Sequence, residues 1–388
     1  MVYLEEKREN TIIRVIGVGG AGGNAVSHMI NQGIQGVDFI CANTDAQVLA
    51  RTGASVLIQL GETGLGAGAN PTVGREAALS DRERIADAIR GAHMVFVTAG
   101  MGGGTGTGAA PVIAEVAREM GILTVGVVTK PFEFEGMKRM RVASQGIEEL
   151  SSSVDSMIVV LNERLQEVLG EDITQKEAFR AADTILCNAV AGIAEIINSP
   201  GMINVDFQDV CTVMSENGRA MMGSSVASGP DRARVAAERA ISCPLLEGIN
   251  LSGARGLLVN ITSSELSLKL REPKEVMNII RSYAAEDATI IYGAVYDSEI
   301  GDDLRVTVVA TGLSEVAPTV DPNLADRRQV VSLSSSSGQI DYDNFDAPAV
   351  IRRREQRVTS SGSIHDRSGR GGGVEVLDIP SFLRRSVE

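Results

Sequence analysis

The chain of 388 residues has no tryptophan, only three histidines and four cysteines. The cysteines Cys41, Cys187, Cys211 and Cys243 lie far apart and form no CxxC pair. This spacing argues against a zinc site or a thiol redox motif, and a reducing compartment is the simplest setting. With so few histidines and aromatic rings, histidine-based catalysis and base stacking are also poorly supported.

An excess of basic residues is also lacking. Lys and Arg number 36 against 50 Asp and Glu, which gives a formal net charge of -14. This is the wrong sign for holding a nucleic-acid backbone by counterion release, so we expect no nucleic-acid partner. A phosphate ligand would have to be held locally by backbone N–H groups and bound cations.

Long hydrophobic runs are the third absence. No run of about 18 apolar residues occurs, so no transmembrane segment is expected. The first residues, MVYLEEKREN, do not resemble a signal peptide. We therefore expect a cytoplasmic protein that reaches a membrane only through a partner or a terminal segment.

The order of apolar runs predicts an α/β fold. Continuous apolar runs such as TIIRVIGV, HMVFVTAG and ILTVGVVTK alternate with helical patterns, as in a parallel sheet covered on both faces. A periodic segment before Ser199-Pro200-Gly201 predicts one long helix. We divide the chain into a nucleotide-binding domain (1–174), a central helix (175–200), a smaller α/β domain (201–313), a flexible linker rich in Ser and Gly (314–373) and a terminal peptide (374–388).

A first glycine cluster, Gly17 to Asn24, directly follows the first strand and opens a helix, predicted near Gly22–Asn31. Glycine lets backbone N–H groups approach an anion, and a helix N-terminus adds partial positive charge. Gly17, Gly19 and Gly22 also satisfy GxGxxG, so an NAD-dependent Rossmann enzyme stays open, as does a turn without a ligand.

A second cluster, Gly100 to Gly108, also follows an apolar strand and precedes a helix, predicted over Ala109–Met120. Such a loop is costly in backbone entropy, and wrapping a di- or triphosphate accounts for that cost. A dehydrogenase has no use for a second loop of this kind. The P-loop pattern GxxxxGK[ST] is absent.

The run GGGTGTG from Gly102 to Gly108 resembles the signature of the tubulin and FtsZ GTPase superfamily. Further runs resemble its FtsZ branch, including IGVGGAGGNAV, NTDAQ, VVTKPFEFEG, NVDFQDV and MSENGRAMMG. The resemblance implies a tubulin-like fold: a Rossmann-type parallel-sheet GTPase domain joined by a long central helix to the smaller domain. It also implies GTP or GDP as the ligand, with Mg²⁺.

The resemblance further implies roles for single residues. Phosphate contacts would come from Gly20, Ala21, Gly22, Gly23, Asn24, Gly102, Gly103, Gly104, Thr105, Gly106 and Thr107. The loops nearest the terminal phosphate and magnesium would contain Asn43, Thr44, Asp45, Ala69 and Asn70, with Asp45 as the candidate metal ligand. Glu135, Arg139, Asn162, Phe179 and Asp183 would contact ribose, phosphate or guanine, with Phe179 stacking on the base and Asp183 accepting from it.

Catalytic carboxylates are expected in the segment Asn204 to Asp209. Spacing alone favours ordinary helix capping by Asp206 and Asp209. The resemblance instead implies that this loop enters the nucleotide site of a neighbouring subunit, where Asn204, Asp206 and Asp209 position the attacking water. Hydrolysis would then depend on head-to-tail self-assembly, which does not close and so produces filaments.

The terminal VLDIPSFLRR turns apolar after the solvated linker and resembles a partner-docking peptide. The resemblance implies binding to membrane tethers such as the actin-like FtsA and to other division regulators. Its candidate contact residues are Leu377, Asp378, Ile379, Pro380, Phe382 and Leu383.

Three hypotheses compete. A polymerising GTPase that forms the mid-cell division ring beneath the inner membrane explains both glycine loops, the acid pair and the tail. An NAD-dependent enzyme explains only the first loop. A polymer-forming relative without hydrolysis is disfavoured by the intact Asn204, Asp206 and Asp209.

Overall fold

The computed structural model describes residues 11–170, 172–198, 201–203, 205–216, 219–242, 254–297 and 300–313. Asn204 and the proposed linker and docking peptide lie outside these residues. One sheet of eleven strands runs through the described part, in the order β3-β2-β1-β4-β5-β6-β8-β11-β9-β10-β7. The strands are β1 (Ile13–Val18), β2 (Val37–Asn43), β3 (Val56–Gln59), β4 (Met94–Gly100), β5 (Leu123–Lys130), β6 (Ser156–Leu161), β7 (Gly201–Ile203), β8 (Arg219–Ala227), β9 (Ala254–Ser263), β10 (Ala284–Tyr296) and β11 (Leu304–Leu313).

The first six strands are all parallel, as the continuous apolar runs predict. β8 continues in parallel beside β6, whereas β11 is antiparallel to both β8 and β9. In β1 and β4, Gly17 is opposite Thr98 and Val18 is opposite Ala99. The carboxyl ends of these two strands therefore lie together at one edge of the sheet.

Helices cover the sheet around three hydrophobic clusters. One cluster joins α1, α8 and α9 to the sheet, a second contains buried residues of α3 to α6, and the third packs α10 and α11 on β8 to β11. The helices are α1 (Gly19–Asn31), α2 (Ala46–Leu49), α3 (Pro71–Ser80), α4 (Arg82–Ile89), α5 (Thr105–Glu119), the short 3-10 helix η1 (Glu133–Glu135), α6 (Met137–Ser151), α7 (Asn162–Leu169), α8 (Gln175–Asn198), α9 (Phe207–Met214), α10 (Arg232–Ile241) and α11 (Arg271–Arg281).

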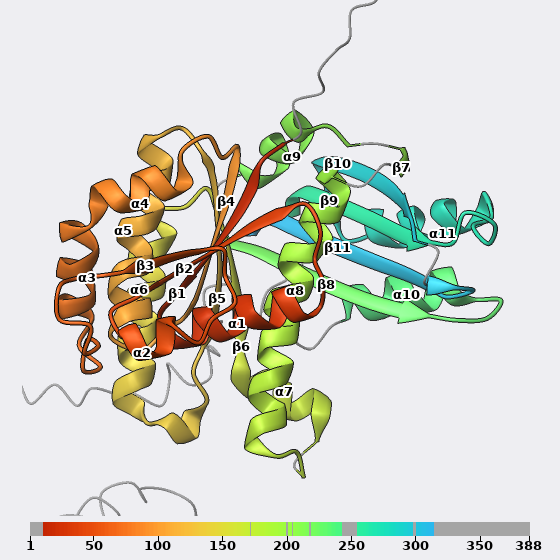
Figure 1. Ribbon diagram of the computed structural model, residues 1–388. Helices are drawn as coiled ribbons and strands as arrows, with labels where there is room; N and C mark the ends of the chain where they lie inside the picture. The colour runs from red at the N-terminus through yellow and green to blue at the C-terminus, as the bar shows by residue number, and fades with distance from the viewer. Residues whose placement is uncertain are drawn as a thin grey trace, which may run out of the picture. The chain divides into compact units, whose positions relative to one another are not determined.

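The predicted central helix is present as α8, which crosses the middle of Figure 1 between the α3 to α6 group and the α10 to α11 group. Its buried residues, among them Leu186, Val190 and Ile193, recur at helical spacing and join the first hydrophobic cluster. By length and composition it is the one described helix that could cross a membrane, and 50% of its most apolar window is buried. A core helix has these same properties.

Two predicted helix boundaries were wrong. We expected a helix near Gly22–Asn31, but α1 begins at Gly19, and the helix expected from Ala109 begins at Thr105. Glycine has low helix propensity, so the sequence favoured loops here. Tertiary packing overrides that preference: a β-carbon on Gly106 would lie 2.7 Å from the carbonyl oxygen of Gly100.

Candidate nucleotide site

The site is built from two glycine-rich helix starts at the carboxyl edge of neighbouring strands. α1 begins directly after β1, and α5 begins five residues after the end of β4. Neither helix has a side-chain cap or an acidic residue in its first turn. Helix N-termini of this kind present N–H groups and partial positive charge to an anion.

The two glycine loops contact each other. A β-carbon on Gly19 would lie 3.0 Å from the backbone nitrogen of Gly106, so only glycine allows this approach. By contrast, a β-carbon on Gly20 or Gly103 would meet no atom within 4 Å. Glycine at these two positions is therefore not required by packing, and the space beside them is open to a ligand.

Thr105 and Thr107, predicted as a pair of phosphate contacts, have different surroundings. The Thr105 hydroxyl lies 2.6 Å from the Thr44 hydroxyl, which links the second glycine loop to the end of β2. Thr107 is buried, and its hydroxyl oxygen accepts a hydrogen bond from the Gly102 nitrogen at 2.8 Å. Thr107 therefore supports the loop from inside. Gly102 has a left-handed backbone, and its β-carbon would meet Arg139 at 2.7 Å.

The loop after β2 places three candidate residues beside Thr105. Asn43 and Thr44 are buried, and the Asn43 amide oxygen accepts from the Asp45 nitrogen. Asp45 caps α2, with its Oδ1 accepting from the nitrogens of Gln47 and Val48 at 2.9 and 3.1 Å. These two bonds hold the carboxylate of Asp45, the predicted magnesium ligand, at the first turn of α2.

Ala69 and Asn70 form the neighbouring wall. Ala69 is the one non-glycine residue with positive φ in the described ranges, at 57°. Asn70 caps α3, because its side-chain oxygen accepts from the Thr72 nitrogen at 3.1 Å. A β-carbon on Gly104 would lie 2.9 Å from the Asn70 nitrogen. This wall is therefore pressed directly against the second glycine loop.

Three of the predicted base, ribose and phosphate contacts, Phe179, Glu135 and Arg139, lie around Phe132. Phe179, on α8, is 38% exposed and meets the buried Phe132 edge to face, with ring centroids 5.3 Å apart. Glu135 pairs with Arg139 at 3.2 Å and accepts from the Phe132 nitrogen. Sequence reasoning missed Phe132, although it is part of the VVTKPFEFEG run that carried the resemblance.

Two further polar groups in this region are unusual. Asp183 lies one helical turn after Phe179, and burial raises its pKa to about 6. Asn162 opens α7 and is buried, and its side-chain oxygen has no hydrogen-bond partner. A buried polar atom without a partner is costly unless a ligand satisfies it. Asn24 is exposed on α1.

No group of three His, Cys, Asp or Glu side chains capable of holding a metal occurs among the residues that the structure describes. Mg²⁺ is commonly bound through one or two carboxylates, substrate phosphates and water. Asp45 directly follows Thr44, whose hydroxyl contacts Thr105 at the start of α5, and a single carboxylate at this place fits this mode of binding.

The candidate catalytic acids lie near the opposite ends of the strands from the glycine loops. Asp206 caps α9 with its Oδ1 2.8 Å from the Asp209 nitrogen, and both residues are exposed. Phe207 of the same helix contacts the ring of His93, with centroids 6.1 Å apart. His93 immediately precedes β4 and accepts from Ile12 just before β1. The acids are therefore near the amino ends of the strands whose carboxyl ends carry the glycine loops.

Comparisons with known proteins identify the family. Residues 12–170 match the model of the Tubulin/FtsZ family, GTPase domain, and residues 218–314 match that of the FtsZ family, C-terminal domain. The chain is 52% identical over 391 residues to the cell division protein FtsZ of Pseudomonas aeruginosa, with 98% of each chain covered. The chain belongs to the FtsZ family. A second relative, FtsZ of Coxiella burnetii, is 51% identical over 387 residues, covering 99% of this chain and 98% of that protein.

Solved structures agree with this fold, and one of them is an FtsZ. An empty FtsZ dimer of M. jannaschii matches with a TM-score of 0.75 and 43% identity, covering 79% of this chain and 89% of that chain. The GTPγS-bound protofilament of CetZ2 from Haloferax volcanii shares the fold, with a TM-score of 0.66 at 19% identity over 82% of this chain and 97% of its own. The predicted family, fold class and GTPase activity are confirmed, and these matches give the NAD-dependent alternative no support.

Proposed function

We propose that this FtsZ-family chain is a self-assembling cell-division GTPase whose active site is completed by a second copy of the chain. The observation that carries the proposal is the separation of the glycine loops from Asp206 and Asp209. They lie at opposite ends of the same strands, and a six-residue strand spans about 20 Å. One subunit therefore cannot bring its own acids to its own nucleotide.

Head-to-tail stacking removes this separation. If the α9 edge of one copy docks on the glycine-loop edge of the next, its acids enter a site that already holds the nucleotide. Such an interface is heterologous and open, so repeated docking gives a filament. The M. jannaschii dimer and the CetZ2 protofilament are consistent with assembly in this fold.

Within the site, this chain's groups divide the work between binding and positioning. The starts of α1 and α5 receive the phosphates, Phe179 and Asp183 receive the guanine, and Asn162 gains a partner for its buried oxygen. The carboxylate of Asp183 can accept from both the N1–H and the amino group of guanine, which adenine lacks in that arrangement.

Hydrolysis needs mainly positioning and charge stabilisation. Mg²⁺, held by Asp45 and the phosphates, would neutralise negative charge on the terminal phosphate. Asp206 is already oriented by its bond to the Asp209 nitrogen, while the Asp209 carboxylate extends from the first turn of α9. We assign Asp209, with Asp206 and Asn204, to holding and polarising the attacking water.

The proposed setting is the bacterial division ring, beneath the inner membrane. The proposal includes the terminal peptide 374–388 as the docking site for FtsA-like tethers. Binding of a tether by the full chain and by a chain ending at residue 373 tests this part, and equal binding would refute it.

The decisive test is GTP hydrolysis per subunit as protein concentration rises, with Mg²⁺ present and sedimentation in parallel. A shared site predicts that specific activity rises where pelletable polymer appears, and that ATP does not substitute. Constant activity per subunit at all concentrations would show that one chain holds a complete site.

A further inference from the structure

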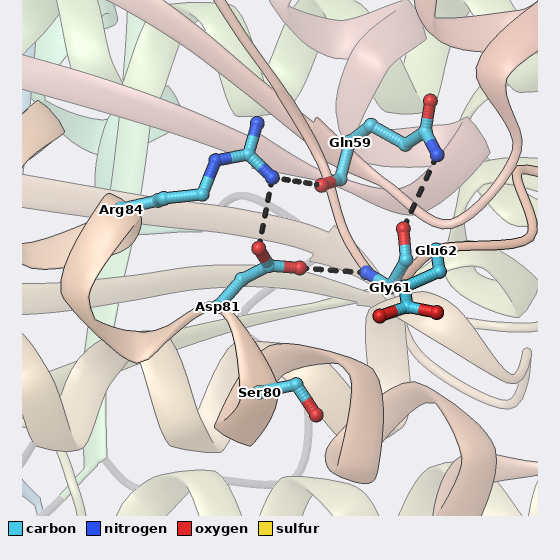
Figure 2. Close-up of a pocket in the computed structure, with 6 residues that line it drawn as sticks. All are labelled: Gln59, Gly61, Glu62, Ser80, Asp81 and Arg84. Carbon is cyan, nitrogen blue, oxygen red and sulfur yellow. Dashed lines mark hydrogen bonds and ion pairs between the residues drawn. The ribbon is translucent and has the colours of Figure 1, made fainter.

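A hydrogen bond between the Gly61 nitrogen and the Asp81 side chain closes a ring of 21 residues beside the nucleotide site. The Asp81 carboxylate accepts from the Gly61 nitrogen at 2.7 Å through Oδ2 and from Arg84 at 2.8 Å through Oδ1. Arg84 also donates to the Gln59 carbonyl oxygen at 3.0 Å. Figure 2 shows these bonds at the rim of a pocket of about 480 Å³ lined by Gln59, Gly61, Glu62, Ser80, Asp81 and Arg84.

The position of Asp81 in the chain gives this bond its importance. Asp81 lies between α3 and α4, where its side chain could cap α4, but it makes no capping bond. The carboxylate instead reaches back to the residue that begins the loop before α3. Its side chain is 13% exposed, so this charge-assisted bond is largely sheltered from water.

The ring contains Ala69 and Asn70, the wall of the nucleotide site described above. From Gly61 the chain runs through a loop to Asn70, then along α3, and back to Asp81. The middle of the loop is attached to the end of β2, because the Gly66 nitrogen donates to the Thr44 carbonyl at 3.0 Å. Its end is pressed against Gly104, where a β-carbon would lie 3.1 Å from the Asn70 oxygen.

The loop also has intrinsic reasons to move if it is not held. Four of its glycines, Gly61, Gly64, Gly66 and Gly68, have positive φ, and the strained Ala69 lies directly before Asn70. Glycine-rich backbone has many alternative conformations, and strained residues persist only where surrounding contacts hold them. Two side chains hold the start of this loop: Asp81 accepts from the Gly61 nitrogen at 2.7 Å, and the Gln59 Nε2 donates to the Gly61 oxygen at 3.2 Å. Of the two, the Asp81 bond is the charge-assisted one.

We propose that Asp81, supported by Arg84, is a positioning residue for the terminal phosphate of the bound nucleotide. It holds the 61–70 loop so that Asn70 and the start of α3 stay against the second glycine loop. The inference rests on the proposed GTPase function. It predicts that losing the ring weakens triphosphate binding more than diphosphate binding, because Ala69 and Asn70 are the residues predicted to lie nearest the terminal phosphate.

The chain offers a closely matched control. Asp87 and Arg90 form a second Asp–Arg pair with the same i,i+3 spacing at 2.6 Å, but both side chains are about 70% exposed and no loop depends on them. Asp81→Ala and Asp87→Ala each remove one charge and one such pair. Asp81→Asn is the conservative variant, since its amide oxygen can still accept from the Gly61 nitrogen.

The experiment measures equilibrium binding of GTP and GDP to the full chain below the assembly threshold, together with the thermal midpoint. Asp81→Ala should lose about tenfold in GTP affinity and about twofold or less in GDP affinity, as expected for a displaced contact loop. Asp81→Asn should recover most of the loss, and Asp87→Ala should match the parent.

Two results would overturn the inference while leaving the GTPase function intact. Equal losses for GTP and GDP with a lower thermal midpoint would mean that Asp81 supports the fold in general. Unchanged affinities would mean that the loop is held without it. Failure of the parent chain to bind GTP would overturn the proposed function and this inference with it.

Discussion

The helix starts beside the two glycine loops differ from the starts of α9 and α11. α1 begins with Gly19 and α5 begins directly after Gly104, both without a side-chain cap or first-turn acid, whereas α9 is capped by Asp206 and has Asp209 in its first turn. At α11, Glu272 in the first turn pairs with Arg232 of α10. α6 and α10 also begin without a side-chain cap or a first-turn acid, so the missing acid alone does not mark a ligand site. The starts of α1 and α5 are suited to an external anion because they also lie together in glycine loops with open space beside Gly20 and Gly103.

The largest expected effect is on the stability of the fold, at the start of α11, where the protein's own acid pairs with an arginine. Arg232 and Glu272 are both nearly buried and bind each other at 2.7 and 3.0 Å. Arg232→Met should lower the free energy of unfolding by about 3 to 5 kcal/mol, because it leaves a buried carboxylate unpaired. Denaturant unfolding measures this.

Arg234 provides the control for that change. It is on the same helix and pairs with Glu238, but both side chains are about half exposed. Arg234→Met should leave stability nearly unchanged, since exposed pairs contribute little. Similar losses in the free energy of unfolding for the two variants would mean that burial does not determine how much the Arg232–Glu272 pair contributes to stability.

The second prediction concerns Asp209. Asp209→Asn keeps the backbone nitrogen that Asp206 caps, so the fold and GTP binding should stay intact. Turnover should fall by about 100-fold or more, as when one positioned electrostatic group is removed from a site. GTP hydrolysis above the assembly threshold measures it, with Asp87→Asn as an exposed acid control.

Mixing two defective chains sharpens this test. If Asp209→Asn is combined with a chain that cannot bind nucleotide, some interfaces pair an intact acid loop with an intact nucleotide site. Mixed filaments should then recover part of the activity. No recovery, despite proven co-assembly, would contradict the shared site.

The third prediction separates glycines that packing requires from glycines that a ligand requires. Gly103→Val should weaken GTP binding by about 30-fold, because its side chain enters open space beside α5. The thermal midpoint without nucleotide should be unchanged. Gly106→Ala is the contrasting variant, since its β-carbon would meet the Gly100 oxygen at 2.7 Å and should destabilise the apo protein.

These cases show what the sequence can and cannot reveal. The parallel strands, the long helix α8 and the position of the two glycine loops at helix starts follow from apolar periodicity and glycine spacing. The helix starts at Gly19 and Thr105 could not be predicted, because they depend on contacts between loops distant in sequence. Likewise, no local pattern indicates that Asp81 binds Gly61 or that Phe132 meets Phe179. Spacing alone predicted that Asp206 caps a helix, and the structure confirms this cap. The catalytic role of Asp206 stays a proposal.

The smallest expected effect concerns Asp183, where function and stability oppose each other. Its folded pKa of about 6 lies above the ordinary value near 3.8, so the folded state holds its proton longer than the unfolded state does. Protonation of Asp183 therefore stabilises the folded state at low pH, and this contribution is lost as pH rises from about 4 to 6. Asp183→Asn should therefore raise the thermal midpoint of the apo protein at pH 7.

The same change should lower GTP affinity by about tenfold, because the carboxylate that accepts from guanine is gone. In the parent chain, GTP affinity should fall as pH drops through 6, and in Asp183→Asn this dependence should disappear. Binding titrations at several pH values measure it, with the exposed Asp172→Asn as control. If Asp183→Asn kept both the affinity and its pH dependence, Asp183 would have no contact with the base, and its burial would be a cost of packing alone.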